Sequence, residues 1–428
     1  MEIEKIYEKF QECSGVSTDT RKININSLFF ALKGDNFDAN KFALEAIIKG
    51  AKYVVIDNAS FKIEGKTIIV EDTLKCLQAL AKYHRKQLKT ILIGLTGSNG
   101  KTTTKELINA VLSSKFKTIA TIGNLNNHIG VPLTLLRLKP ETEIGIIEMG
   151  ANHQKEIAFL CNITEPDYGY ITNFGKAHLE GFGGIEGIIE GKSELYYNLE
   201  TENKSAFVNL DDTLQKEKTK NIKRITFSQQ EEIANVFISK VETNPMVSVT
   251  FNNVKIQSNL IGAYNATNIN ASICIGKHFN IDEIAIKKAI EAYIPDNNRS
   301  QLVEKNSNEL ILDAYNANPS SMQAAIENFT KISKENKIAI LGDMFELGKE
   351  SLAEHKIIVD QLKQLEKIET YFIGKDFYQN KVKSPHLYFY ENFEEFSEYI
   401  KNKNIRNSFI LIKGSRGMAL ERTLEILN

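Results

Sequence analysis

The sequence predicts an α/β protein with three domains, and three observations indicate this class. Apolar strand candidates alternate with polar loops and helical stretches along most of the 428 residues. One of these strands leads into a glycine-rich turn and a helix at residues 91–103. The alternation starts anew near residue 86 and again beyond Arg299. We therefore expect a small N-terminal α/β domain at 1–85, a central P-loop domain with a mostly parallel sheet at 86–297, and a C-terminal Rossmann-like domain at 298–428.

Each predicted domain has its own strands. The N-terminal domain has them at 27–33, 51–56 and 66–70, and a helix from Leu74 to Gln87 then leads on. The central domain has strands at 90–95, 143–148, 167–172 and 205–209, which indicate a parallel sheet, and a strand-rich segment at 222–262 for which we expect a subsidiary sheet. The C-terminal domain has strands at 309–313, 337–341, 370–374, 386–390 and 408–413, without a G-x-G-x-x-G turn, so a dinucleotide cofactor is not supported.

Charge, cysteine content and apolar patterning exclude several protein classes. The net charge of −1 and the pI near 6.7 differ from the basic balance of nucleic-acid and membrane-surface binders. The four cysteines are widely spaced, as is typical of reduced thiols. The N-terminus has no apolar run of signal-peptide length, and no stretch reaches the about 18 apolar residues that span a bilayer. We expect a cytoplasmic protein, and a monomer, that binds no nucleic acid and does not insert into a membrane.

The turn after the first central strand is typical of a phosphate-binding loop. Gly97 and Gly100 let backbone N–H groups approach an anion at a helix N-terminus. Lys101 would neutralise the β- and γ-phosphates of ATP, and the Thr102 hydroxyl would bind Mg²⁺. Leu95 stands where the strict pattern has glycine, so the loop is a variant. The alternative is an ordinary strand–turn–helix with a surface lysine. We favour the phosphate-binding P-loop.

Polar residues follow the other central strands, where ligands bind in parallel sheets. Glu148 ends a buried strand, and a buried carboxylate is costly unless it is paired or binds a metal such as Mg²⁺. The alternative is a structural carboxylate that caps the next helix. His178 lies in a glycine-rich loop after the strand at 167–172. These positions make Thr102 and Glu148 candidate Mg²⁺ ligands. A lone histidine is usually not functional, but His178 follows a strand end next to this predicted Mg²⁺ site.

Three further positions are candidates with open alternatives. Lys192 is either a solvated helix lysine or, if it is buried near Mg²⁺, a neutral amine that captures CO₂ as a carbamate. Arg299 lies at the predicted domain junction and either reaches a transferring phosphoryl group or forms an interdomain salt bridge. The segment Asp313–Pro319 offers a carboxylate and two amides to a polar ligand, or is only a capped turn.

With these residues, the chain resembles the Mur ligases over nearly its whole length. The motifs that carry the resemblance are Ser17–Arg21, Gly94–Thr102, Gly123–Pro132, Glu148–His153, Ala177–Gly183, Gly191–Leu195, Tyr264–Asn268, Tyr315–Pro319, Leu341–Gly348 and Lys413–Gly417. The resemblance implies an N-terminal domain for a UDP-sugar, a central ATPase domain and a C-terminal domain that closes over the site. Members of the family often have a histidine immediately before the asparagine of the motif at 264–268, and this chain has Tyr264 there. The difference argues against a role for that ring but not for Asn265.

The resemblance also implies a role for individual residues. For the nucleotide-sugar it implies Ser17, Thr18, Asp19, Thr20 and Arg21, and for the second substrate Tyr315, Asn316 and Asn318. For ATP it implies Thr96, Gly97, Ser98, Asn99, Gly100, Lys101, Thr102, Asn127, His128, Asn265, Asn268, Arg299 and Asp313. For Mg²⁺ it implies Thr102, Glu148 and His178, and for catalysis Lys101, Glu148, His178, a carbamylated Lys192 and Arg299.

The implied reaction is ATP-dependent amide formation between UDP-N-acetylmuramoyl tripeptide and D-alanyl-D-alanine, through an acyl phosphate. Two sister activities stay open: a Mur ligase that adds a single amino acid, against which the Asn-Ala-Asn-Pro segment argues, and a folylpolyglutamate-type synthetase, against which Ser17–Arg21 argues. A nucleotide-dependent switch protein would be expected to carry Asn-Lys-x-Asp, which we do not find. A non-catalytic scaffold would have lost Lys101, Glu148 or Arg299.

Overall fold

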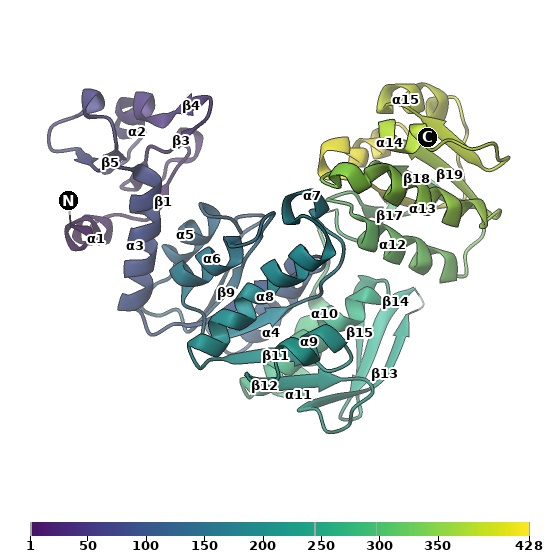
Figure 1. The fold of residues 1–428 in the computed structure, drawn as a ribbon, viewed down its shortest axis with the longest axis horizontal. Helices are drawn as coiled ribbons and strands as arrows, with labels where there is room; N and C mark the ends of the chain where they lie inside the picture. The colour runs from purple at the N-terminus through teal and green to yellow at the C-terminus, as the bar shows by residue number, and fades with distance from the viewer. Residues whose placement is uncertain (1, 244, 297, 428) are drawn as a thin grey trace.

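The computed structural model describes residues 2–243, 245–296 and 298–427. The limits that the sequence predicts at residues 1, 297 and 428 lie outside them. Figure 1 shows three α/β units in chain order, with the N-terminal unit on one side, the C-terminal unit on the other and the central unit between and below them. The predicted α/β class with mostly parallel sheets is confirmed.

The N-terminal unit holds a parallel sheet in the order β1-β2-β5-β6 and a hairpin β3-β4. Its strands are β1 (Val16–Ser17), β2 (Leu28–Phe30), β3 (Lys33–Gly34), β4 (Phe37–Asp38), β5 (Tyr53–Ile56) and β6 (Thr67–Ile69), and its helices are α1 (Ile3–Gln11) and α2 (Ala43–Ile48). The long helix α3 (Thr73–Gln87), capped by the Asp72 carboxylate, runs from this unit to the central one (Figure 1).

The central unit is built on a nine-stranded sheet in the order β15-β14-β13-β12-β11-β10-β7-β9-β8. The strands from β8 to β13 pair in parallel, and β13, β14 and β15 pair antiparallel. The strands are β7 (Ile91–Thr96), β8 (Thr118–Ala120), β9 (Ile144–Glu148), β10 (Tyr168–Ile171), β11 (Ser205–Asn209), β12 (Lys223–Ser228), β13 (Val236–Thr243), β14 (Met246–Phe251) and β15 (Val254–Ile261).

The prediction of a subsidiary sheet at 222–262 is wrong, because β12 continues the main sheet. It pairs in parallel with β11 from Ser205↔Lys223 to Asn209↔Phe227. The physical reason is burial: Ile225 and Phe227 join Phe207 of β11 in one hydrophobic cluster. Detached from this cluster, these apolar side chains would be exposed to water.

Helices cover both faces of the central sheet, which explains why its strands are apolar on both sides. The helices α4, α10 and α11 contact one another on one face, and α3, α5, α6 and α8 contact one another on the other. Their bounds are α4 (Lys101–Ser113), α5 (Gly130–Leu135), α6 (Glu156–Thr164), α7 (Leu179–Phe182), α8 (Ile185–Thr201), α9 (Thr213–Lys218), α10 (Tyr264–His278) and α11 (Glu283–Ala292).

The C-terminal unit has a six-stranded sheet in the order β16-β17-β21-β18-β19-β20, parallel except for the β16–β17 hairpin at one edge. The strands are β16 (Gln301–Lys305), β17 (Asn308–Asp313), β18 (Lys337–Gly342), β19 (Ile368–Ile373), β20 (Leu387–Tyr390) and β21 (Phe409–Lys413). The helices are α12 (Pro319–Lys331), α13 (Ser351–Lys363), α14 (Lys375–Gln379) and α15 (Phe393–Lys401). Within the described part of the chain, no helix is both long and apolar enough to span a bilayer.

The loop before α7 joins the central unit to the C-terminal unit. The Lys176 ammonium lies 2.6 Å from Oε1 of Glu354 on α13, and the Lys176 N–H donates to the Ser320 hydroxyl at 2.8 Å. The Glu180 N–H donates to the Glu346 carbonyl at 3.2 Å. Figure 1 shows α7 next to the C-terminal unit. These contacts bring the P-loop and the C-terminal unit to one pocket.

Candidate active site

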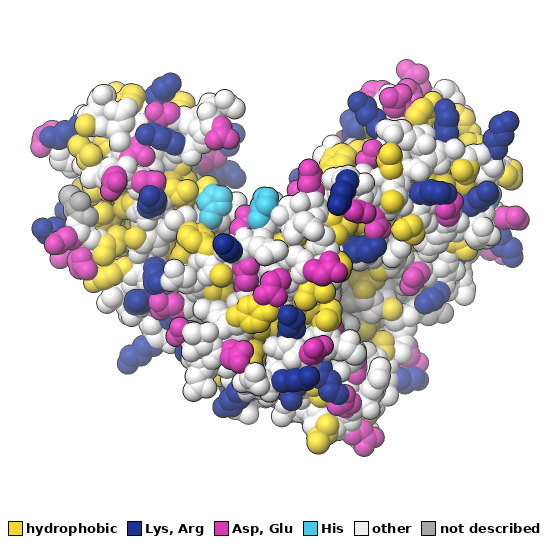
Figure 2. Space-filling view, in the orientation of Figure 1, with side chains coloured by type: hydrophobic (Ala, Val, Ile, Leu, Met, Phe, Trp, Pro, Cys, Tyr) yellow, Lys and Arg dark blue, Asp and Glu magenta, His cyan; other side chains and the backbone are white. Residues whose placement is uncertain are grey.

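A cavity of about 720 Å³ lies where the P-loop side of the central unit faces the C-terminal unit. Figure 2 shows a wide cleft between the N-terminal and C-terminal units, with histidine side chains on its floor. The volume is in the range of cofactor and ligand pockets. Residues from β7–α4, the 124–128 loop, the end of β9, the loop after β10, α10 and the segment 313–321 line it.

The P-loop is held by the end of the neighbouring strand β10. The Ser98 N–H donates to the Asn173 carbonyl at 3.0 Å, and the Thr172 hydroxyl donates to the Asn99 carbonyl at 2.6 Å. Gly97 has a φ of +139°, and a Cβ on it would lie 2.0 Å from Thr172 Oγ1. Only glycine therefore fits at this close approach. Gly100 caps α4 with a φ of +77°.

Lys101 lies inside this loop and bonds to its backbone. Its Nζ donates to the carbonyl of Gly97 at 2.7 Å and to that of Ser98 at 3.2 Å. Its pKa is lowered, first by burial, and repulsion by Arg299 lowers it further, whereas the Glu148 charge raises it. Two cations from different units thus face one space, which favours an anion such as a phosphate between them.

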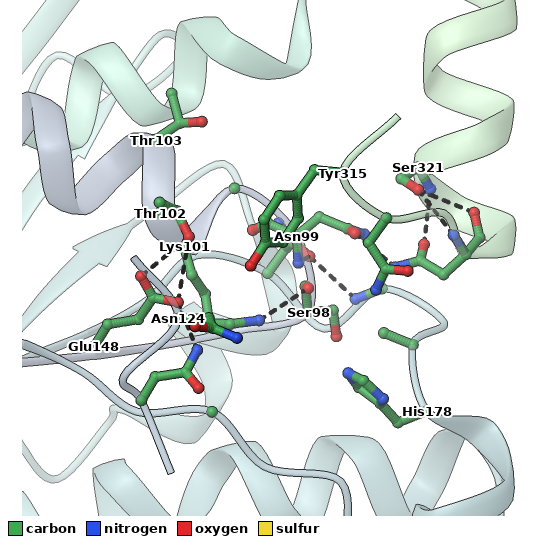
Figure 3. Close-up of a pocket in the computed structure, with 18 of the residues that line it drawn as sticks. Ser98, Asn99, Lys101, Thr102, Thr103, Asn124, Glu148, His178, Tyr315 and Ser321 are labelled. Atoms are coloured by element: carbon green, nitrogen blue, oxygen red, sulfur yellow. Dashed lines mark hydrogen bonds between the residues drawn. The ribbon is translucent and has the colours of Figure 1, made fainter. Parts of the chain in front are cut away.

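Thr102 and Glu148 meet next to the P-loop. The Thr102 hydroxyl donates to the Glu148 carboxylate at 3.1 Å (Figure 3), and Glu148 is only 1% exposed. The Asn126 amide donates to Oε1 of Glu148 at 2.8 Å, and the Glu148 N–H donates to the Thr121 hydroxyl at 3.0 Å. Clustered hydroxyl and carboxylate oxygens are the donor type that Mg²⁺ prefers, so these residues fit that ion.

His178 lines the same pocket but faces another residue. Its Nδ1 lies 2.5 Å from Oε2 of Glu346 in the C-terminal unit, and this contact lowers the pKa of Glu346. Figure 3 shows the imidazole on the other side of the pocket from Glu148. The structure therefore does not bring His178 to Thr102 and Glu148.

Lys192 is buried behind the end of β9. It is 1% exposed, its Nζ donates to the Ala151 carbonyl at 3.2 Å, and it lies 4.9 Å from the centroid of the Phe182 ring. Burial, and then repulsion by Lys101, lower its pKa well below 10.5. The reading of a solvated helix lysine is wrong, because α8 turns this side chain inward among apolar neighbours.

Arg299 and the segment after β17 form the C-terminal wall. The Arg299 guanidinium carbon lies 3.7 Å from the centroid of the Tyr315 ring. Asp313 accepts from the Ser300 N–H at 3.0 Å and from Nζ of the buried Lys413 at 2.6 Å. Asn316 is exposed.

Asn318 connects the C-terminal unit with the P-loop. Its side-chain oxygen caps α12 by accepting from the Ser321 N–H at 2.9 Å. Its amide group donates to Oδ1 of Asn99 at 2.7 Å. The segment is therefore a capped turn that also contacts the P-loop.

The remaining nucleotide candidates take supporting positions. Asn265 and Asn268 line the pocket, and Asn268 accepts from the Thr104 hydroxyl of α4 at 3.0 Å. Asn127 accepts from the N–H groups of Ile129 and Gly130 at 3.1 and 2.9 Å. His128 is exposed at the pocket rim, and Thr96 is buried at the end of β7.

The candidates Ser17, Thr18, Asp19, Thr20 and Arg21 do not line this pocket. They lie in the N-terminal unit, where Asp19 caps a short 3-10 helix and pairs with Arg21 at 2.8 Å. This pairing lowers the pKa of Asp19 to about 2. The Arg21 side chain is 84% exposed.

The pocket residues that escaped the sequence-based selection include Asn126, Glu346 and Lys413. Asn126 and Lys413 had a signal, since Asn126 stands in the Gly123–Pro132 motif and Lys413 is a charged residue that ends an apolar strand. Glu346 stands in the Leu341–Gly348 motif, but its role in the pocket is seen only through its contact with His178, which is distant in sequence.

One other titratable cluster, in the C-terminal unit, could geometrically hold a cation. Asp343, His355 and Asp376 form the only group of three metal-ligating side chains found within the described ranges. Nε2 of His355 accepts from the Met344 N–H at 3.0 Å, and Asp343 accepts from the N–H groups of Asp376 and Phe377. These bonds occupy the donor atoms and anchor the loop that carries Glu346.

Comparison with known proteins gives family matches along most of the chain. The model of the Mur ligase middle domain matches residues 95–276, and that of the Mur ligase, glutamate ligase domain matches residues 298–416. UDP-N-acetylmuramoyl-tripeptide--D-alanyl-D-alanine ligase of Bacillus subtilis is 34% identical, over 96% of this chain and 93% of the relative. The Escherichia coli enzyme of the same name is 34% identical with the same coverage.

Solved structures give the same likeness. MurF from Acinetobacter baumannii has a TM-score of 0.86 at 29% identity, covering 99% of this chain and 97% of that one. MurF from Thermotoga maritima in complex with ADP has a TM-score of 0.81 at 27% identity, covering 96% of each chain. On the strength of these matches, the chain belongs to the Mur ligase family.

Proposed function

We propose that the protein is an ATP-dependent ligase that joins D-alanyl-D-alanine to UDP-N-acetylmuramoyl tripeptide, in cytoplasmic synthesis of peptidoglycan precursors. The relatives of that name match this chain over nearly its full length. The observation that carries the proposal is the pocket in which Lys101 of the central unit and Arg299 of the C-terminal unit face one space. A phosphoryl group transferred there is contacted from two units.

ATP fits the P-loop side of this pocket. The N–H groups at the start of α4 and the Lys101 ammonium would bind its β- and γ-phosphates. Thr102 and Glu148 would hold Mg²⁺, which would supply Lewis-acid stabilisation of phosphoryl charge. His178 would join them only after it leaves Glu346. Asn127, His128, Asn265 and Asn268 would surround the nucleoside, and Asp313 would orient the C-terminal wall.

The tripeptide carboxylate would attack the γ-phosphorus of ATP, which forms an acyl phosphate and releases ADP. Lys101 and Arg299 would stabilise the charge on the transferred group. The amine of D-alanyl-D-alanine, held near Asn316 and Asn318, would then attack the acyl carbon and release phosphate. Contacts of the loop before α7 with the C-terminal unit would keep water from the acyl phosphate.

The nucleotide-sugar end of the tripeptide would bind to the N-terminal unit at Ser17–Arg21, across the cleft of Figure 2. Since this end lies far from the reacting carboxylate, its contacts would supply binding energy that positions the carboxylate at the P-loop.

We further propose that Lys192 carries a carbamate. Its lowered pKa favours the neutral amine, and that amine is the form that captures CO₂. We expect activity to fall in CO₂-free buffer and to return on addition of bicarbonate, with a Lys192→Arg variant inactive in both. Equal activity with and without CO₂ would contradict the carbamate.

The proposed function is tested by release of phosphate from ATP and Mg²⁺. Wild-type protein is given UDP-N-acetylmuramoyl tripeptide, with D-alanyl-D-alanine, with D-alanine alone or with neither. We expect turnover only with the dipeptide, a product whose mass includes the dipeptide, and loss in Lys101→Ala. Turnover with a single amino acid would instead identify a sister ligase.

A further inference from the structure

The segment that carries Arg299 has an unusual backbone. Residues Asn298 and Ser300 both adopt left-handed conformations, with φ of 55° and 51°. Such conformations are unfavourable for serine unless neighbouring contacts hold them. The segment continues the β16–β17 hairpin, because the Tyr315 N–H donates to the Asn298 carbonyl at 3.1 Å and the Ser300 N–H donates to Asp313. Arg299 thus projects from a turn that is fixed on both sides.

Tyr264 holds this turn from the central unit. Its hydroxyl lies 2.7 Å from the Ser300 hydroxyl, a hydrogen bond between the start of α10 and the residue after Arg299. Its ring packs on Gly262, where a Cβ would lie 2.5 Å from Tyr264 Cε1. The ring therefore has little room to move, and the hydroxyl is a fixed point on the central unit.

Tyr315 holds the other end of Arg299. The guanidinium carbon lies 3.7 Å from the ring centroid, and the buried Nε has no hydrogen-bond partner within the described residues. When a guanidinium stacks on an aromatic ring, its N–H groups point sideways, parallel to the ring face. They are then free to bind two phosphoryl oxygens at once. Tyr315 lines the same pocket as Asn99 of the P-loop.

We propose that Tyr315 and Tyr264 are positioning residues for Arg299. Tyr315 supports the guanidinium, and Tyr264 fixes the turn through Ser300, so that Arg299 reaches the phosphoryl group bound by Lys101. This inference rests on the proposed function, and it gives Tyr315 a role toward Arg299 rather than toward the dipeptide.

A double-mutant cycle on the ligase reaction tests this coupling. We expect Tyr315→Ala to lower kcat about tenfold and to change the KM of D-alanyl-D-alanine less than about twofold. Tyr315→Phe, which keeps the aromatic ring, should restore kcat. Arg299→Ala should cost about 10³-fold, and adding Tyr315→Ala to it should cost little more. Tyr264→Phe, which removes only the hydroxyl, should lower kcat about threefold, again only when Arg299 is present.

Two results would overturn the proposal. The first is an additive effect of Tyr315→Ala on the Arg299→Ala background, and the second is a rise in the KM of the dipeptide as the main effect of Tyr315→Ala. An unchanged kcat in Tyr264→Phe would show that Tyr264 does not position Arg299. Circular dichroism and thermal unfolding show whether each variant folds.

A binding experiment separates this inference from the ligase function. The affinity of each variant for a non-hydrolysable ATP analogue and for ADP is measured by calorimetry. Because of Arg299, the wild-type protein should bind the ATP analogue more tightly than ADP. Tyr315→Ala, Arg299→Ala and the double variant should all reduce this preference to the same level. A wild-type protein that binds nucleotide but forms no product would contradict the proposed function alone. An additive loss of preference would overturn the role of Tyr315.

Discussion

Glu148 illustrates how single contacts orient a buried carboxylate in this pocket. Thr102 and Asn126 bind its two oxygens from different segments, and a bond to its N–H fixes the end of β9. A carboxylate that is 1% exposed depends on these partners, since burial without them is costly.

Asn126→Ala removes one of these partners. We expect the Mg²⁺ concentration for half-maximal activity to rise about tenfold, because partners of a metal ligand affect metal affinity to that extent. Asn124→Ala is the matched control, since Asn124 lines the same pocket and no contact to Glu148 is found for its side chain in the described structure. An equal change in both variants would contradict the orienting role of Asn126.

His84 links pH to stability. It is buried between α1 and the central unit, where Nε2 lies 2.9 Å from the Leu138 carbonyl and Nδ1 lies 3.2 Å from the Tyr7 hydroxyl. Burial lowers its pKa below 6.5, so the unfolded chain binds the proton more tightly than the folded one. Stability is therefore complete above pH 6.5 and falls as the pH drops below it.

Thermal unfolding at a series of pH values measures this effect. His84→Gln keeps a donor for the Leu138 carbonyl but does not titrate in this range. We expect the difference in Tm between wild type and variant to shrink or reverse on acidification below pH 6.5. Parallel curves for the two proteins would show that His84 is not the group responsible.

At the scale of elements, the P-loop depends on its neighbour β10. Gly97→Ala would place a Cβ 2.0 Å from Thr172 Oγ1, and its φ of +139° is unfavourable for alanine. We expect this variant to lose ATP affinity at least about tenfold, since the loop must move away from β10. Gly34→Ala, with nothing within 4 Å of the added carbon, should bind ATP normally in the same titration. Normal binding by Gly97→Ala would mean that the loop adapts.

Local patterns predicted most elements, because buried parallel strands are apolar on both faces and are bounded by polar turns. The strand at 205–209 was predicted with its observed bounds, and the helix at 74–87 begins one residue earlier, after the Asp72 cap. The strands β8 and β16 were missed, since none of their residues is fully buried and neither strand has the apolar run of a core strand. The segment at 222–262 was placed wrongly, because strand neighbours depend on packing partners distant in sequence, here Phe207 with Phe227.

The sequence also predicted part of the candidate site. The strand-end rule identified Glu148, and glycine spacing identified the loop with Lys101, both of which line the pocket. The orientation of His178 toward Glu346 and the stacking of Arg299 on Tyr315 depend on how two units meet. No local pattern records such contacts, so sequence reasoning left the role of both side chains open.

At the scale of the whole molecule, reactive groups come from separate units. Lys101 belongs to the central unit and Arg299 to the start of the C-terminal one, and Asn99 with Asn318 and Lys176 with Glu354 join the two. Assembly across units suits an intermediate that water would destroy, since the site is complete only when the units meet. The account therefore predicts an acyl phosphate rather than direct condensation.

Transfer of oxygen-18 tests this central claim most directly. The tripeptide is labelled in its terminal carboxylate, the reaction is run with ATP and D-alanyl-D-alanine, and the released phosphate is analysed by mass spectrometry. We predict that each phosphate carries one labelled oxygen, because the carboxylate oxygen that attacks the γ-phosphorus leaves with it. Unlabelled phosphate, or label in AMP, would contradict the account.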